Sequence, residues 1–311
     1  MAEPWPPTVS PEAAQAVAAM QAMPTPDAPP TSAQMRQFAD AIQQHLGQSQ
    51  LARYGVTLGA DEVDGVPVRS FAPAPDGAKT PSSPEPTILL NLHGGGFMVD
   101  SGSMTENIAL CARTRLPVIS ALYRMAPEHP YPAAVDDALA VYRRLLRTHA
   151  PGRIGLYGTS AGAILAAQLL VRLQAEGEPL PAALGFFSGT ADLARDGDCE
   201  SYLPRVPTGS IVKSMSPYAG DTPRQSPALS PIFADLSGFP PTLTLASTRD
   251  QLLSHTAMFH RALVNAGVEA ELIVFEGLPH AFWAYIEAPE TDEAFDHMAR
   301  FFLRRLGQGR A

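Results

Sequence analysis

Residues 154–167, IGLYGTSAGAILAA, contain the feature that most constrains the fold of this chain. A Gly-x-Ser-x-Gly sequence lies here between a strand-like apolar run and a helix-forming run. A turn this sharp holds Ser160 in a strained backbone conformation, with its hydroxyl at the tip. The residues two before and two after the serine must lack side chains, since strand and helix would otherwise collide. Gly158 and Gly162 fill those two places, so Ser160 is the candidate nucleophile.

Two other interpretations of this stretch compete with the first. The motif arises by chance in chains rich in Gly and Ser, and the uncharged run over residues 154–171 is long enough for a membrane span. The expected strand over 154–157 and helix over 163–174 argue against chance. Three glycines with Thr159 and Ser160 near the start of the run favour a buried strand–turn–helix, so we expect no stable membrane insertion.

Composition excludes several classes of protein. The 311 residues allow one large domain or two small ones, and a hydrophobic content of 45% is ample for a core. A formal net charge of −9 argues against nucleic acid, which is bound by clustered Lys and Arg. Cys111 and Cys199 do not make a disulfide framework or a zinc site, and we expect buried or free thiols. The N-terminus lacks the basic and apolar parts of a signal peptide, which favours a cytoplasmic location.

From residue 87 onward, short apolar strands alternate with helices. Continuously apolar strands separated by helices predict an α/β fold with a mainly parallel sheet flanked by helices. In such sheets, ligands bind beyond the carboxyl ends of the strands. The expected strands span residues 87–92, 118–122, 154–157, 183–187, 242–246 and 271–275, and the expected helices include 131–148, 253–266 and 290–306.

The N-terminal part is organised differently. Ser10-Pro11 is a helix start, and residues 31–46 form a second expected helix with an apolar face at helical spacing, namely Met35, Phe38, Ile42 and Leu46. Strands are expected over 56–58 and 66–71, before a polar connection over 72–86. The composition shift near residue 50 divides the chain into segments 1–50 and 51–311. The Pro-, Gly- and Ser-rich region 193–231 interrupts the alternation as an insertion.

Three consecutive glycines follow the strand at 87–92. Gly94, Gly95 and Gly96, in the sequence HGGGF, expose backbone N–H groups with no side chain in the way. Acyl transfer needs such donors for the oxyanion of its tetrahedral intermediate, and Ala161, after the serine, would add its own N–H. A flexible loop or a phosphate cradle is the alternative. Neither a Gly-x-Gly-x-x-Gly sequence nor a Walker lysine is present, which disfavours phosphate.

Two further candidates follow later strands. Asp250 comes after the strand at 242–246, and His280 after the strand at 271–275. The order Ser160, Asp250, His280 is the one this architecture requires. His280 would take the serine proton, and Asp250 would hold the imidazole in the correct tautomer. Asp192 and Asp235 are weaker rivals, because neither follows a strand as directly. The other histidines lie in expected helices, near helix ends, or, as His93, in the glycine loop.

These motifs resemble the bacterial hormone-sensitive-lipase-like (family IV) carboxylesterases of the α/β-hydrolase fold. The matching segments are HGGGF (93–97), YRMAPEHPYPAAVDDA (123–138), GTSAG (158–162), TRD (248–250) and PHAFW (279–283), and GTSAG in place of GDSAG is typical of a subgroup. The resemblance implies an eight-stranded sheet and no metal or organic cofactor. It also implies a helical cap, built from residues 1–50 and the insertion at 193–231, over a catalytic domain at 51–311.

Two departures from the family pattern stand out. Asp250 is followed by Gln251-Leu252 where the family often has Pro-Leu, and Ala281 stands where a glycine often follows the histidine. The predicted function is a serine carboxylesterase that hydrolyses small-molecule esters of short to medium chain through an acyl-enzyme. A lactone or amide substrate stays open, as does homodimer formation. A non-catalytic small-molecule receptor is disfavoured, because receptors on this scaffold lose a triad member and all three are present.

Overall fold

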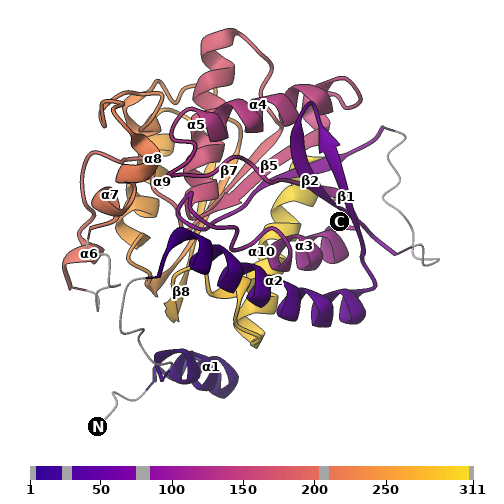
Figure 1. Ribbon diagram of the computed structural model, residues 1–311, viewed down its shortest axis with the longest axis vertical. Coiled ribbons are helices and arrows are strands. Elements are labelled where there is room, and N and C mark those ends of the chain that lie inside the picture. The colour runs from indigo at the N-terminus through magenta and orange to yellow at the C-terminus, as the bar shows by residue number, and fades with distance from the viewer. Residues whose placement is uncertain (1–4, 23–29, 75–84, 203–209, 308–311) are drawn as a thin grey trace.

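A computed structural model describes residues 5–22, 30–74, 85–202 and 210–307 of the chain. One eight-stranded sheet lies at its centre, with helices packed on both faces (Figure 1). The strands are β1 (Thr57–Val63), β2 (Val66–Ala72), β3 (Ile88–Leu92), β4 (Val118–Ala121), β5 (Ile154–Thr159), β6 (Ala183–Phe187), β7 (Thr242–Arg249) and β8 (Ala270–Pro279). All eight expected strands are therefore present, and β1, β7 and β8 run further than the sequence patterns suggest.

The order of the strands in the sheet is β1-β2-β4-β3-β5-β6-β7-β8. The pairs β1–β2 and β2–β4 are antiparallel, whereas every other neighbouring pair is parallel. The mainly parallel sheet is thus confirmed. The six parallel strands, β3 to β8, have their carboxyl ends at one edge of the sheet. Residues 93–96, Ser160, Asp250 and His280 each follow one of these strands and so lie at that edge.

The longer helices are α1 (Pro11–Gln21), α2 (Ser32–Tyr54), α3 (Thr105–Thr114), α4 (Ala133–Leu146), α5 (Ala161–Glu176), α9 (Leu253–Asn265) and α10 (Pro289–Arg305). Short turns of helix are α6 (Cys199–Tyr202), α7 (Ile211–Ser214), α8 (Ser216–Ala219), η1 (Pro151–Arg153), η2 (Pro231–Phe233) and η3 (Phe282–Ala284). Of the longer helices, only α3 has no counterpart among the expected elements.

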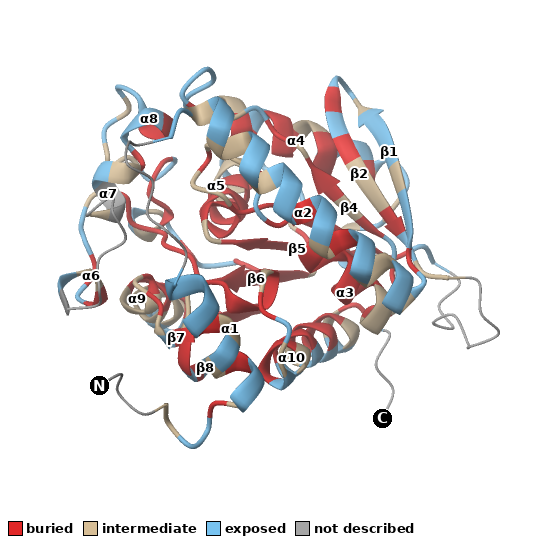
Figure 2. Ribbon diagram, turned by 60° about the horizontal axis from the view of Figure 1, so that its bottom comes forward, coloured by how far each residue is buried: buried red, intermediate tan, exposed pale blue. Residues whose placement is uncertain are grey.

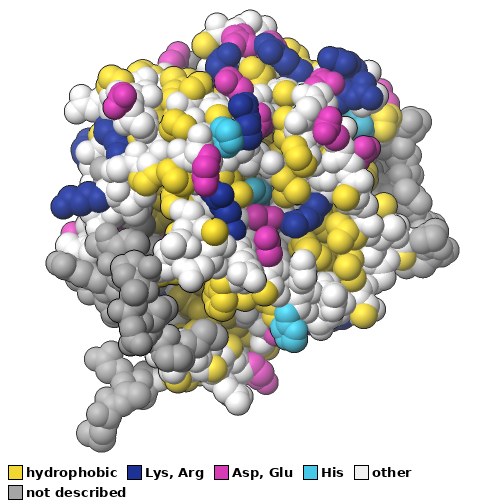
Figure 3. All heavy atoms as spheres, in the orientation of Figure 1, with side chains coloured by type: hydrophobic (Ala, Val, Ile, Leu, Met, Phe, Trp, Pro, Cys, Tyr) yellow, Lys and Arg dark blue, Asp and Glu magenta, His cyan; other side chains and the backbone are white. Residues whose placement is uncertain are grey.

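Two apolar layers hold the helices against the sheet, because successive strand residues point to opposite faces. In β3, Leu90 packs in the layer beneath α4, α5 and α9, while its neighbour Leu89 packs in the layer that contains α3 and α10. Figure 2 shows these inward faces as buried. On the outer surface, acidic and basic side chains are interspersed over the face seen in Figure 3.

The N-terminal helices begin where the sequence predicts. Ser10 caps α1 by accepting a hydrogen bond from Ala13 N, and Thr31 caps α2 in a reciprocal pair with Gln34. However, α2 continues through the composition shift near residue 50 and ends at Tyr54, where Gly55 adopts a left-handed conformation with φ of 63°.

The expected apolar face of α2 is wrong in one respect. Phe38 is 63% exposed and Ile42 is 37% exposed, while the buried positions of this helix are Gln43 and Gly47. The reason is a close helix–helix contact: α2 packs on α3, and a Cβ at Gly47 would lie 2.6 Å from the Met104 side chain. Small size at Gly47, rather than an apolar stripe, decides which face is buried.

The insertion at 193–231 lies beside the glycine loop. The ring of Tyr218, from α8, stacks on Phe97 with ring centroids 3.4 Å apart. Parts of several expected segments lie outside the described residues, namely 1–4 and 23–29 of the N-terminal segment, 75–84 of the polar connection and 203–209 of the insertion.

The two cysteines and the uncharged run at 154–171 agree with the expectations from the sequence. Cys111 and Cys199 are both buried and form no disulfide, as expected. Among the described residues, no helix has the length and apolar character that crossing a membrane requires. The uncharged run at 154–171 forms β5 and most of α5, in the middle of the fold.

Candidate active site

Ser160 sits at the sharp turn between β5 and α5. Its backbone has φ of 57° and ψ of −119°, a conformation that L-residues rarely adopt. A Cβ at Gly158 would lie 2.2 Å from Gly162 O, and a Cβ at Gly162 would lie 1.8 Å from Leu92 O. The steric prediction is confirmed: strand and helix approach so closely at these two positions that only glycine fits.

The structure brings the three predicted residues together. His280 Nε2 lies 3.0 Å from Ser160 Oγ, and His280 Nδ1 lies 2.8 Å from Asp250 Oδ1. The same Asp250 oxygen accepts a hydrogen bond from Leu252 N at 2.8 Å, which fixes the carboxylate. Ser160 follows β5, Asp250 follows β7 and His280 follows β8, so the parallel sheet delivers all three to one edge. The geometry suits proton transfer from serine to histidine.

Charge and burial act in opposite directions on this pair. Burial alone lowers the pKa of His280, but the charge and hydrogen bond of Asp250, with a contribution from the charge of Glu106, raise it above the usual value. Burial alone raises the pKa of Asp250, but His280 brings it below the usual value. Asp250 is fully buried, so its negative charge acts on the imidazole with little screening by water.

The rival acids are elsewhere. Asp235 is exposed and accepts a hydrogen bond from Ser237 N. Asp192 is buried but pairs with Arg195 and accepts from Ala194 N. Two of the other histidines have local partners: His255 lies between Thr190 and Glu200, and His93 stacks on Tyr123 with Nδ1 bonded to Gly94 O.

The glycine loop faces Ser160. Gly95 has φ of 117°, and a Cβ there would lie 2.0 Å from Val99 O, so no larger residue fits. A Cβ at Gly94 would lie 2.9 Å from Thr159 O and 3.5 Å from Ser160 Cβ, which shows how closely the loop approaches the serine. In the part of the chain that the structure describes, the N–H groups of Gly95, Gly96 and Ala161 donate no hydrogen bond to another backbone group.

A buried carboxylate holds this loop in shape. Asp100 accepts hydrogen bonds from Gly102 N at 3.3 Å and Ser103 N at 3.0 Å, and it pairs with Arg69 at 2.6 Å. Burial alone raises the pKa of Asp100, but His93 and Arg69 bring it below the usual value. The loop between β3 and α3 is therefore braced by a charged group against the antiparallel part of the sheet.

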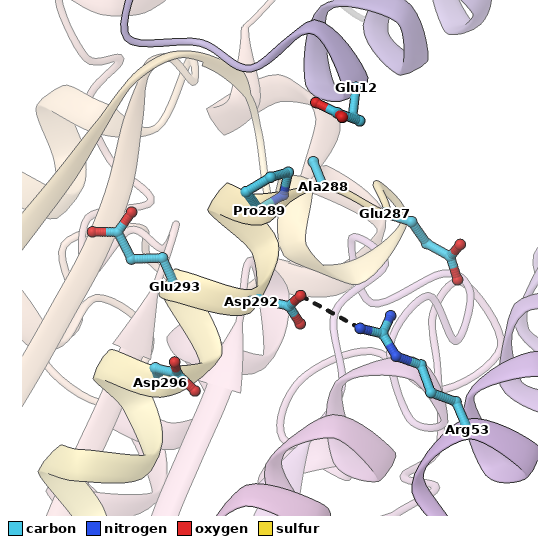
Figure 4. Close-up of a pocket in the computed structure, with 8 residues that line it drawn as sticks. All are labelled: Glu12, Arg53, Glu287, Ala288, Pro289, Asp292, Glu293 and Asp296. Carbon is cyan, nitrogen blue, oxygen red and sulfur yellow. Dashed lines mark ion pairs between the residues drawn. The ribbon is translucent and has the colours of Figure 1, made fainter.

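A cavity of about 260 Å³ opens at Ser160, and we call it the Ser160 cavity. It is lined by Gly94, Gly95, Gly96, Ser101, Glu106, Thr159, Ser160, His280, Ala281, Ala284 and Tyr285. A larger hollow of about 570 Å³ lies between α1, α2 and the start of α10 (Figure 4), where Asp292 pairs with Arg53. That hollow has neither a nucleophile nor a histidine among its lining residues, so the Ser160 cavity is the candidate active site.

Sequence reasoning missed four residues that line this cavity, of which Glu106 carries a carboxyl group; the others are Ser101, Ala284 and Tyr285. Glu106 lies in the first turn of α3, is 2% exposed, and lines the Ser160 cavity beside Thr159. An acidic residue at the start of a helix is ordinary, so the sequence carries no signal that sets Glu106 apart.

Comparison with known proteins agrees with the fold. A family model described as alpha/beta hydrolase fold matches residues 89–284. The chain is 34% identical over 242 residues to an acetyl-hydrolase of Streptomyces hygroscopicus, covering 74% of this chain and 79% of that protein. It is 30% identical over 225 residues to an esterase of Acinetobacter venetianus, covering 69% and 74%. A solved esterase structure from the bacterial hormone-sensitive lipase family matches with a TM-score of 0.82 at 29% identity, covering 96% of this chain and 99% of that one.

Proposed function

The chain belongs to the α/β-hydrolase-fold family, and from that membership we propose that it is a serine carboxylesterase of the hormone-sensitive-lipase-like branch, in its GTSAG subgroup. Its catalytic triad is Ser160, Asp250 and His280. The observation that carries the proposal is the continuous hydrogen-bond path from Asp250 through His280 to Ser160 at the wall of the Ser160 cavity. The esterase and acetyl-hydrolase names of its relatives support an ester substrate.

The mechanism starts at the serine. His280 Nε2 accepts the Ser160 proton while Oγ attacks the ester carbonyl, and the carbonyl oxygen becomes an oxyanion. The N–H groups of Gly94, Gly95, Gly96 and Ala161 are the candidate donors to that oxyanion, with Gly95 the strongest candidate. The imidazolium, held by Asp250, then protonates the leaving alcohol. Water attacks the acyl-enzyme with His280 as the base, which restores the serine.

The size of the Ser160 cavity supports short substrates. Its volume of about 260 Å³ lies below the range of roughly 300–1,000 Å³ that is common for small-molecule pockets. We therefore propose acyl groups of short to medium chain. Lactones and amides are the alternatives at the same site, because the same attack and oxyanion serve them.

A substrate panel tests the proposal. Purified protein is assayed with p-nitrophenyl esters of increasing acyl length, with several lactones and with anilides. We expect turnover of the esters, highest for the short chains. Preferred turnover of lactones would assign the cyclic-ester alternative. Binding without turnover of any compound would contradict an enzyme and favour the receptor alternative.

We also propose that α2 and the insertion at 193–231 form a cap over this site. Arg36 of α2 donates to Met98 O at 2.8 Å and to Ala126 O at 2.9 Å, beside the glycine loop. The methyl group of Met215, before α8, would lie 3.7 Å from a Cβ at Gly96. If the cap shapes the binding wall, Arg36→Met should raise KM at least about threefold, because hydrogen bonds from a charged group contribute roughly 1.5–3 kcal/mol and partial burial shields these two from water. Arg300→Met, at an exposed position on α10, is the control, and equal KM values in both variants would contradict a cap.

A further inference from the structure

Glu106 is a buried carboxyl group that the proposed reaction does not use. It projects from the first turn of α3 to the wall of the Ser160 cavity, where Ser160 and His280 also lie. A Cβ at Gly102 would lie 3.1 Å from Glu106 Cδ, so the glycine leaves room for the carboxyl group. With 2% exposure, Glu106 has left bulk water almost completely.

The hydrogen bonds of this carboxyl group are incomplete. Oε1 accepts from Trp283 Nε1 at 3.3 Å, a long bond, while Oε2 has no hydrogen-bond partner among the described residues. A side-chain hydrogen-bonding contact from Thr159 lowers the pKa of Glu106, but neither Thr159 Oγ1 nor Glu106 Oε2 has a partner in good hydrogen-bond geometry among the described residues. Buried polar atoms are nearly always paired, so a carboxylate oxygen without a protein partner on the wall of the Ser160 cavity can accept a hydrogen bond from a molecule that enters the cavity.

Electrostatics also favour a partner that donates hydrogen bonds. Burial raises the pKa of Glu106 to about 7, and the negative charge of Asp100 adds to this, while Thr159, Trp283 and His280 oppose it. Among the ion pairs of the described residues, none joins Glu106 to an Arg or Lys. An N–H or O–H group at Oε2 would therefore meet an acceptor that the protein itself leaves unsatisfied.

We propose that Glu106, beside Thr159, is a polar binding subsite of the Ser160 cavity that takes a hydrogen-bond donor, a hydroxyl or an ammonium group, on the substrate. The preferred substrates are then esters with such a donor a few atoms from the carbonyl carbon. This inference rests on the proposed esterase function and adds a substrate class to it. Glu106 binds the donor group and so selects among ester substrates, whereas Ser160 and His280 carry out the bond-making steps.

Matched ester pairs test the subsite. Ethyl 3-hydroxybutanoate is compared with ethyl 3-methylbutanoate, and ethyl 4-aminobutanoate with ethyl pentanoate, so that within each pair a methyl group replaces the donor. Hydrolysis is followed by titration at pH 8, where a group with a pKa of about 7 is mostly ionised. The quantity measured is the ratio of kcat/KM within each pair, which cancels any general change in activity.

The expected ratio of kcat/KM, donor ester over methyl ester, depends on whether Glu106 accepts a hydrogen bond from the donor. An apolar wall would favour the methyl compound, because the donor would lose its hydration without a new partner. With Glu106 as partner, the wild type should favour at least one donor ester by about tenfold or more. Preference in the hydroxyl pair or in the ammonium pair identifies which donor the subsite takes. Preference for the methyl compound in both pairs would overturn the inference.

Variants assign the preference to this residue. Glu106→Gln should reduce the ratio at least about fivefold, whereas Glu287→Gln, at an exposed position outside the Ser160 cavity, should keep it. A ratio unchanged in Glu106→Gln would overturn the inference. If that variant does not fold, the wild-type comparison still decides. Hydrolysis of p-nitrophenyl butanoate without donor preference refutes the subsite alone, while absence of all ester turnover refutes the proposed function and the subsite with it.

Discussion

His280 Nε2 lies 3.0 Å from Ser160 Oγ, although 120 residues separate the two in the sequence. The contact forms because β5 and β8, which precede Ser160 and His280, end at the same edge of the mainly parallel sheet. β7 ends at that edge too and brings Asp250 to His280. A change that moves any one of these strand ends therefore breaks the proton path.

The proposed role of Asp250 as the acid of a catalytic triad is tested by comparison with Asp235. Asp250→Asn should lower kcat by roughly 10⁴-fold, because an amide at this position favours the wrong tautomer of His280. Asp235→Asn, at an exposed position with only a local hydrogen bond to Ser237 N, should leave kcat unchanged. Steady-state assays of the two purified variants decide, and a reversal of the two effects would identify Asp235 as the acid.

The pH profile reports on His280. The imidazole must be neutral to accept the serine proton, and its pKa is raised above the usual value of 6.5 because Asp250 and Glu106 outweigh burial. The kcat/KM of the wild type should therefore rise with pH through an apparent pKa above 6.5.

Glu106→Gln provides the control on the sign of this effect. Removing the negative charge lowers the pKa of His280, so the rising limb should move to lower pH. Because the pKa of Glu106 is about 7, Glu106 and His280 titrate in the same pH range. The rise of the wild-type kcat/KM with pH therefore reports the titration of both groups together. A limb that stays in place, or moves to higher pH, would show that Glu106 does not act on His280.

The glycine loop is tested by adding one methyl group. Gly95→Ala places a Cβ 2.0 Å from Val99 O at a φ of 117°, so the loop must move and its N–H donors with it. Loss of one oxyanion donor costs on the order of 10²–10³ in kcat. Gly152→Ala, where nothing lies within 4 Å, is the matched control. Equal kcat in the two variants would exclude Gly95 from the oxyanion site.

Much of this fold could be predicted because its signals are local. Apolar strands, helix caps such as Ser10, and the glycines around Ser160 act over a few residues. The steric need for glycine at Gly158 and Gly162 is of this kind. The position of each predicted site residue just after a strand also follows from local patterns. Because parallel strands end at one edge of the sheet, residues in that position lie close together in the fold.

The parts that escaped prediction depend on tertiary contacts. α3 begins without a side-chain cap, so its sequence shows no capping residue that would mark the start of a helix. It also buries polar residues, so its polar positions do not mark an exposed face. On α2, the contact of Gly47 with Met104 leaves Phe38 exposed, against its apolar character. The position of Glu106 was missed for the same reason, because only the packing of α3 beside η3, where Trp283 donates to Glu106, brings its carboxyl group to the Ser160 cavity.

A labelling experiment tests whether Ser160 is the nucleophile of an ester hydrolase. The wild type and Ser160→Ala are treated with an organophosphate and analysed by peptide mass spectrometry, with kcat measured in parallel. We predict one phosphoryl adduct on Ser160, no adduct in the variant, and a fall in kcat of roughly 10⁴-fold or more, since the triad acts as a unit. An adduct on another residue, or a folded variant that keeps more than about a tenth of the wild-type kcat, would contradict this role of Ser160.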